Sequence, residues 1–232
     1  MPKAVNSNLK PLYGLYFVVT AFEITAEYVE YRPALIILKP LIPLMLICFY
    51  WIASPKRNIL FFLAMIFSML TNLLFIFTSD RMLLGAVVAF MIHRIIVIWF
   101  ILRLLRITDY IPAVIASIPL LLIFCYLLSI TNEIPETTFW LLIIQNILIA
   151  MLGGIAFSTY MVSDTKRNSW LLICGLLFTV LQFVVFIEKY YLSGMSPVIF
   201  RPIAMVLNAF AFYTFYRFVL ATETSDHDSA TG

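Results

Sequence analysis

The chain has 232 residues, of which 63% are apolar and 12% are charged, and its mean hydropathy is +1.03. Soluble domains contain roughly 45–50% apolar and about 25% charged residues, so this chain has too little polar surface for a water-soluble enzyme domain or a disordered protein. The net charge of +3 is small and scattered, which excludes a nucleic-acid-binding surface. The composition therefore predicts a polytopic membrane protein.

Eight apolar runs, each close to the roughly 20 residues of a transmembrane helix, are separated by charged or turn-forming residues. They cover residues 11–29, 34–52, 59–77, 82–101, 111–130, 139–161, 170–187 and 197–219. The runs do not alternate polar and apolar residues, as strands of a membrane barrel must. We therefore expect an all-α bundle of eight transmembrane helices. Residues 1–220 would form a single domain, and the polar tail at 221–232 would be disordered.

Lysines and arginines are distributed unevenly between the two ends of these runs, and this bias sets the expected orientation. Nine lie on the side of the N-terminus and five on the opposite side, with Arg94 inside a run. The basic pairs of the loops are all on the N-terminal side: Lys56 and Arg57, Arg103 and Arg106, and Lys166 and Arg167. Both termini are therefore expected in the cytoplasm. The short loops are typical of a bacterial inner-membrane protein, with a eukaryotic internal membrane as the alternative location.

The three cysteines, Cys48, Cys125 and Cys174, are isolated within apolar runs and lack the spacing of metal ligands. They are typical of small buried residues, and we expect no disulfide, no metal site and no cofactor. The sequence also lacks a nucleophile elbow, a P-loop and a dinucleotide-binding fingerprint.

Polar side chains at membrane depth are costly, and they mark candidate functional residues. They are Glu23, Glu27, Lys39, Ser68, Asn72, His93, Arg94, Gln145, Asn146, Gln182, Arg201 and Asn208. In the expected orientation most of them lie in the outer half of the membrane, so we predict a polar cavity between the helices that opens outward. Glu23 and Glu27 are four residues apart and share a helix face, and Lys39 could pair with one of these carboxylates. Interhelical hydrogen bonds and side chains that snorkel to the interface are the alternative interpretations.

Four short motifs are distributed over most of the chain. They are Lys39-Pro40-Leu41-Ile42-Pro43, the segment FSMLTNLL at 67–74, Leu84-Gly85 with Phe90 and His93, and the segment GLLFTVLQ at 175–182. Together they resemble helices of the YhhN family, which contains the lysoplasmalogenases. The resemblance implies a bundle of membrane helices and a lysophospholipid or another single-chain lipid as the partner.

The resemblance also implies hydrolysis of the vinyl ether bond of lysoplasmalogens, which yields a fatty aldehyde and a glycerophospho-head group. This reaction needs an acid to protonate the enol-ether carbon and a base to activate water. The family's two aspartate positions hold Asn72 and Gln182 here, and carboxamides do not exchange a proton near neutral pH. Either Glu23 or Glu27 supplies the acid, or the protein no longer performs the reaction.

The candidate catalytic residues are thus Asn72, Gln182, Glu23 and Glu27, and the candidate substrate-binding residues are Lys39, Ser68, His93 and Arg94. A non-catalytic protein that binds or senses a lysolipid, and a small transporter subunit, remain alternatives. The sequence leaves the oligomeric state open.

Overall fold

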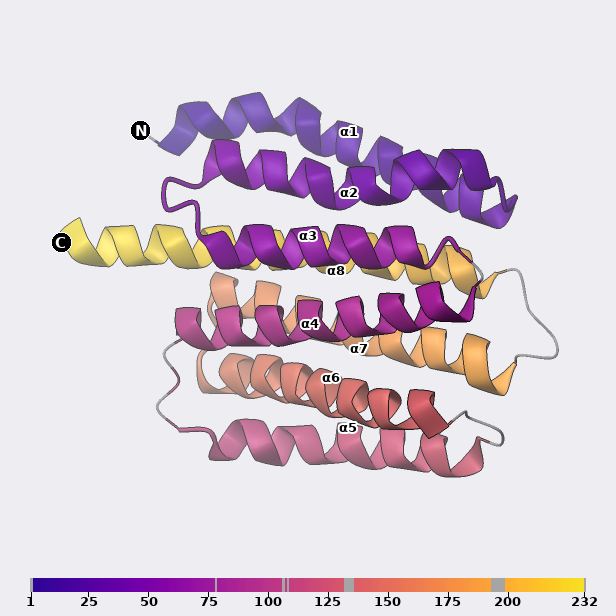
Figure 1. The fold of residues 1–232 in the computed structure, drawn as a ribbon. Helices are drawn as coiled ribbons and strands as arrows, with labels where there is room; N and C mark the ends of the chain where they lie inside the picture. The colour runs from indigo at the N-terminus through magenta and orange to yellow at the C-terminus, as the bar shows by residue number, and fades with distance from the viewer. Residues whose placement is uncertain are drawn as a thin grey trace. The chain divides into compact units, whose positions relative to one another are not determined.

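The computed structural model describes residues 2–77, 79–105, 107, 109–131, 136–192 and 199–231 (Figure 1). These residues form eight α-helices and no strand, which confirms the prediction of an all-α fold. The helices are α1 Pro2–Tyr28, α2 Arg32–Ala53, α3 Ile59–Leu74, α4 Asp80–Leu105, α5 Ile111–Ile130, α6 Glu136–Val162, α7 Lys166–Phe186, which continues as the π-helical turn η1 Ile187–Tyr191, and α8 Phe200–Thr231. Arg106, residues 197–198 and residue 232, which the sequence analysis uses, lie outside the described residues.

Six of the described helices are long and apolar enough to cross a membrane, so the protein is a polytopic helical bundle. They are α2, α4, α5, α6, α7 with η1, and α8. Two of the eight predicted spans are not in this set. α3 ends after 16 residues because the chain turns at Phe75, and α1 contains the carboxylates Glu23 and Glu27 within its apolar stretch.

Short polar caps set where several helices begin. The Asn58 side chain accepts a hydrogen bond from the backbone N–H of Leu60 at the start of α3, and Thr165 caps α7 in the same way. Such caps satisfy backbone N–H groups that the first helical turn leaves without an intrahelical partner. The turn before α2 contains Glu30 at a φ of 54°.

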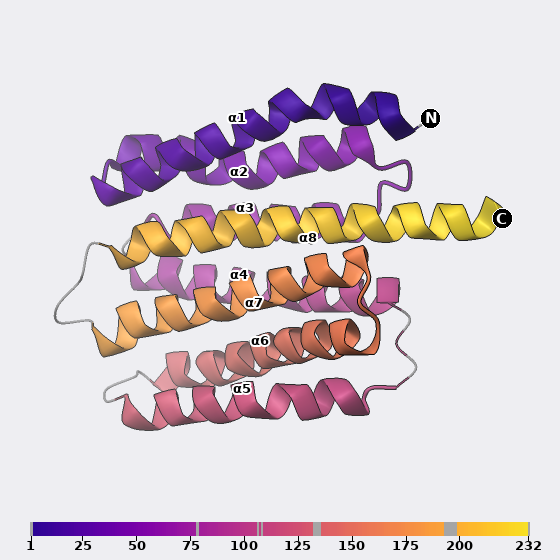
Figure 2. The same ribbon diagram turned by 180° about the vertical axis from the view of Figure 1, so that it is seen from behind.

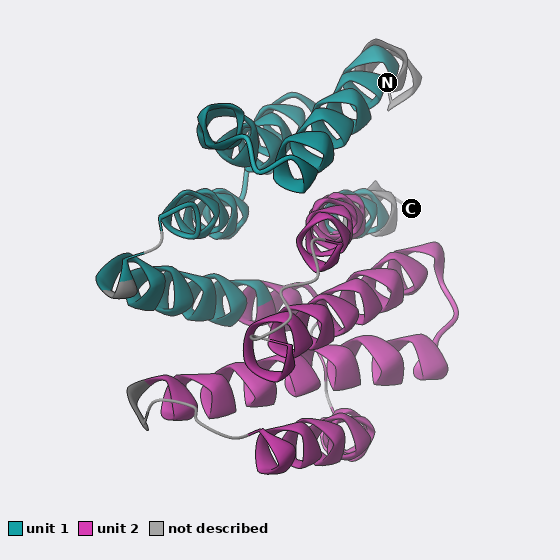
Figure 3. Cartoon of the chain, turned by 90° about the vertical axis from the view of Figure 1, so that its right-hand side faces the viewer, with its two compact units in different colours: residues 1–97, 219–232 teal, residues 98–218 magenta. Residues whose placement is uncertain are grey.

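The chain divides into two compact units (Figure 3). The first contains residues 1–97 and 219–232, and within it α2 packs against α1 on one side and against α3 on the other. α1 and α2 form an antiparallel hairpin, as the views from both sides show (Figures 1 and 2). This hairpin brings the end of α1 beside the beginning of α2.

The second unit contains residues 98–218, in which α6 packs between α5 and α7. Glycines allow these helices to approach closely. A Cβ atom at Gly154 would collide with Ser117 of α5, and one at Gly175 would come within 2.6 Å of the Ala156 side chain. Small residues at helix contacts are typical of membrane bundles, where close backbone packing replaces the hydrophobic effect. That residues 1–220 form a single domain stays a prediction.

Candidate functional site

A buried ion pair joins α1 to α2. Glu27 lies in the last turn of α1, and Lys39 lies two turns into α2, so the tight hairpin places them opposite each other. The Lys39 Nζ atom is 2.9 Å from Glu27 Oε2, and the two side chains are only 7% and 8% exposed. The predicted pairing of Lys39 with a first-span carboxylate is confirmed, and each charge offsets part of the other's desolvation cost.

Glu23 lies one turn before Glu27 on the same face of α1 and is 2% exposed. Its carboxyl group interacts electrostatically with Lys39 and with Glu27. The ammonium group of Lys39, however, pairs directly with Glu27 rather than with Glu23. Two carboxyl groups one helical turn apart therefore have unlike surroundings.

The Lys-Pro-x-x-Pro run of α2 connects this group to α3. In a regular helix the N–H of residue 43 would bond to the carbonyl of Lys39, but Pro43 has no N–H. The Lys39 carbonyl instead accepts a hydrogen bond from the Asn72 side chain, with a long Nδ2–O distance of 3.5 Å. Pro43 thus leaves the Lys39 carbonyl free to accept the bond from Asn72. Asn72, which stands at the first aspartate position of the resembled family, therefore contacts the backbone of Lys39.

Ser68, one turn before Asn72 on α3, is 1% exposed, and its hydroxyl makes no hydrogen bond with the described residues. Helical hydroxyls usually donate to a carbonyl one turn earlier, and Thr71 of the same helix does so to Phe67. The Ser68 hydroxyl therefore keeps its hydrogen-bonding capacity for another group.

His93 and Arg94 form a second group, on α4, around the ring of Phe90. The Arg94 guanidinium carbon lies 4.3 Å from the centre of this ring, and the His93 ring is parallel to it at a centroid distance of 6.0 Å. Both residues are almost completely buried. Cation–π contact lowers the cost of a buried guanidinium.

Gln182 lies in the second unit and forms an amide pair with Asn146. Its Nε2 atom donates to Asn146 Oδ1 at 3.1 Å, which joins α7 to α6, and both side chains are buried. The Nδ2 group of Asn146 has no hydrogen-bond partner among the described residues. The contact confirms the interpretation of Asn146 as an interhelical hydrogen-bonding residue. Its partner Gln182 is expected from the sequence only as a candidate catalytic residue, and that role stays a prediction.

The structure thus brings Glu23, Glu27, Lys39 and Asn72 together, with Ser68 one turn away. We call these five residues the α1–α3 polar cluster. A shared outward-facing cavity around them, which the sequence predicts, stays a prediction.

Sequence reasoning missed a polar contact of Glu223. Its carboxylate accepts hydrogen bonds of 2.6 Å from the Tyr50 hydroxyl and of 2.6 Å from the Ser54 hydroxyl, at the end of α2. Glu223 lies where the sequence analysis expects a disordered tail, but α8 continues through it to Thr231. The sequence shows only that Tyr50 and Ser54 are one helical turn apart, so that their hydroxyl groups can face the same partner. This spacing does not identify Glu223 as that partner.

Groups of three or more His, Cys, Asp or Glu side chains that could hold a metal ion are not found within the described part of the chain. Comparison with protein-family models, with curated proteins and with solved structures finds no match.

Proposed function

We propose that this protein is a membrane-embedded hydrolase that cleaves the vinyl ether bond of a lysoplasmalogen. The observation that carries the proposal is the buried Glu23 carboxyl group beside the Glu27–Lys39 ion pair. Two carboxyl groups in unlike surroundings are the usual arrangement for a general acid and a general base. The resemblance of the sequence to the YhhN family names the bond that such a pair would cleave.

In this proposal Glu23 donates its proton to the second carbon of the vinyl group, and an oxocarbenium ion forms at the first. Glu27, held by Lys39, accepts a proton from the water that attacks this carbon. The resulting hemiacetal breaks its bond to the glycerol oxygen, which takes the proton from Glu27. The hemiacetal hydroxyl returns a proton to Glu23 as the aldehyde forms, so both carboxyl groups regain their starting state.

The remaining members of the α1–α3 polar cluster are suited to binding rather than proton transfer. The Ser68 hydroxyl has unused hydrogen-bonding capacity, which suits a glycerol hydroxyl or the attacking water. Asn72 contacts the backbone carbonyl of Lys39, so its proposed role is to support the helix turn that carries the lysine. His93 and Arg94 are proposed to contribute to head-group binding from α4. We place the protein in the inner membrane of a bacterium, on the basis of its short loops.

The test is release of fatty aldehyde from a defined lysoplasmalogen by the purified protein in detergent. General acid catalysis contributes about 10²–10⁴-fold, so Glu23→Gln should lower the rate at least about 100-fold. Glu30→Gln is the matched control, because the same change is made at an exposed turn residue just beyond α1. Absence of release by the wild type, or equal rates for the two variants, would overturn the proposal.

A second candidate is a non-catalytic protein that binds a lysolipid, and the Asn146–Gln182 amide pair favours it. Gln182 stands at the second aspartate position of the resembled family, and its side chain is engaged in a hydrogen bond between α7 and α6. In that case a lysolipid would co-purify at one molecule per chain and would stay intact on incubation. Delipidated protein that rebinds no lysolipid would exclude this candidate.

A further inference from the structure

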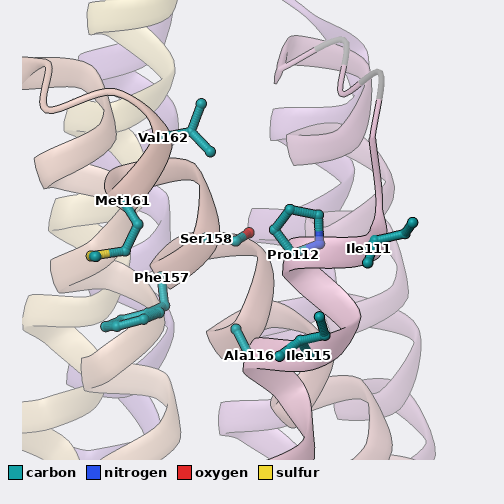
Figure 4. A pocket seen from close by; sticks show the side chains of 8 residues that line it. All are labelled: Ile111, Pro112, Ile115, Ala116, Phe157, Ser158, Met161 and Val162. Carbon is teal, nitrogen blue, oxygen red and sulfur yellow. The ribbon is translucent and has the colours of Figure 1, made fainter.

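An apolar groove of about 420 Å³ lies between the first turns of α5 and the last turns of α6 (Figure 4). Ile111 and Ile115 form one side of it, Phe157, Met161 and Val162 form the other, and Ala116 leaves space between them. Ser158 also lines the groove, but its hydroxyl already donates to the carbonyl of Ile155 at 3.1 Å. The lining therefore suits a hydrocarbon chain better than a polar ligand.

The helices that form the groove both qualify as membrane spans. α5 is the least buried of these six helices, because only 17% of the residues in its most apolar stretch are buried inside the protein. Groove residues at the helix ends are strongly exposed, including Met161 at 68% and Val162 at 78%. Exposed apolar surface on a membrane span is covered by lipid chains, and a chain beside these end turns has its head group near the loop that follows α6.

That loop leads directly into two basic residues, Lys166 and Arg167, which begin α7. Lys166 is four residues from Val162, so the two backbones are at most about 14 Å apart. Lys166 and Arg167 make no ion pair with other described residues, and the Arg167 Nε atom donates a hydrogen bond to Asn168 Oδ1 at 3.0 Å, which leaves its terminal N–H groups for a phosphate. The nearby Asp109 and Asp164 instead accept hydrogen bonds from the backbone N–H of Ile111 and from the Tyr160 hydroxyl.

We propose that this groove holds one acyl chain of an anionic phospholipid, with the phosphate bound by Lys166 and Arg167. The first-turn N–H groups of α7 add to the positive potential at this point. Anionic lipids are concentrated at the cytoplasmic surface, and this end of α5 and α6 is the one that the basic loop residues predict to be cytoplasmic. The site does not depend on the proposed hydrolysis.

The test is native mass spectrometry of the purified protein after incubation with dioleoylphosphatidylglycerol or dioleoylphosphatidylcholine. The wild type should retain one phosphatidylglycerol in preference to phosphatidylcholine by about 30-fold, the factor that two basic residues near a membrane surface supply. Exchanging both Lys166 and Arg167 for glutamine should remove this preference. The same exchange at Lys56 and Arg57, the basic pair after α2, should leave the preference unchanged.

A second variant tests the groove itself. Ala116→Phe should fill it and reduce retention of both lipids at least fivefold, whereas Ala21→Phe, on the exposed face of α1, should not. Equal retention by Ala116→Phe and Ala21→Phe, no preference for phosphatidylglycerol in the wild type, or an equal effect of the Lys56 and Arg57 exchange would each overturn the proposal. Thermal unfolding of every variant in detergent shows that lost retention does not reflect lost folding.

Discussion

Replacing Glu223 by alanine should destabilise the protein strongly, although the residue lies in a segment whose composition is that of a disordered tail. The carboxylate accepts two hydrogen bonds of 2.6 Å, from Tyr50 and from Ser54. Both hydroxyl groups also accept a bond, Tyr50 from the N–H of Asn58 and Ser54 from the N–H of Arg57. Glu223 thus connects the end of α8 to the turn between α2 and α3.

The size of the effect follows from this geometry. A hydrogen bond to a charged group contributes about 1.5–3 kcal/mol, so loss of both should cost about 3–5 kcal/mol after allowance for the cost of burying the carboxylate. Glu223→Gln should cost less, because its amide oxygen can still accept one of the two bonds. Thermal unfolding in detergent should show a decrease on the order of 10 °C for Glu223→Ala.

Thr224→Ala is the matched control, since its exposed hydroxyl bonds only to the carbonyl of Leu220 in its own helix. Combining Glu223→Ala with Tyr50→Phe should cost less than the sum of the single changes, because both remove the same bond. A Glu223→Ala protein that unfolds at the same temperature as Thr224→Ala would refute the reasoning.

Two further changes probe the helix contacts of each unit. Gly154→Ala should destabilise the protein by about 2–3 kcal/mol, because the added methyl group collides with Ser117 and the α5 backbone. Gly14→Ala is the control, since Gly14 has open space around it, and it should stabilise the protein by about 0.5–1 kcal/mol. Both effects are measured by thermal unfolding, and equal effects would contradict the close contact of α5 with α6. Lys39→Met should cost about 3–5 kcal/mol because it leaves the Glu27 charge buried and unpaired, and adding Glu27→Gln should restore most of the loss. A double variant as unstable as Lys39→Met alone would contradict the ion pair.

Local patterns in the sequence predict the helices well. The apolar run at 111–130 coincides with α5, because Asp109 and Pro112 mark its beginning and polar residues follow its end. The run at 170–187 begins four residues later than α7, because the hydrophobic pattern does not detect the cap at Thr165. Patterns of apolarity locate the membrane-facing part of a helix rather than its ends.

Contacts between distant residues are harder to predict. The pairing of Lys39 with Glu27 could be predicted because only a tight turn separates their helices. The bonds of Glu223 could not, since Tyr50 is 173 residues away in the sequence and the tail around Glu223 is polar. The composition of a segment predicts whether it is ordered on its own. It gives no information about contacts with residues that the fold brings close to it.

The measurement that tests the central claim most directly is the position of deuterium in the product formed in D2O. If Glu23 protonates the vinyl carbon, the fatty aldehyde should carry one deuterium on its second carbon, when it is reduced to the alcohol at once to prevent exchange. The Glu23→Gln protein should form this product at least about 100-fold more slowly. Cleavage without deuterium on that carbon, or deuterated product from Glu23→Gln at the wild-type rate, would contradict the assignment of Glu23 as the acid.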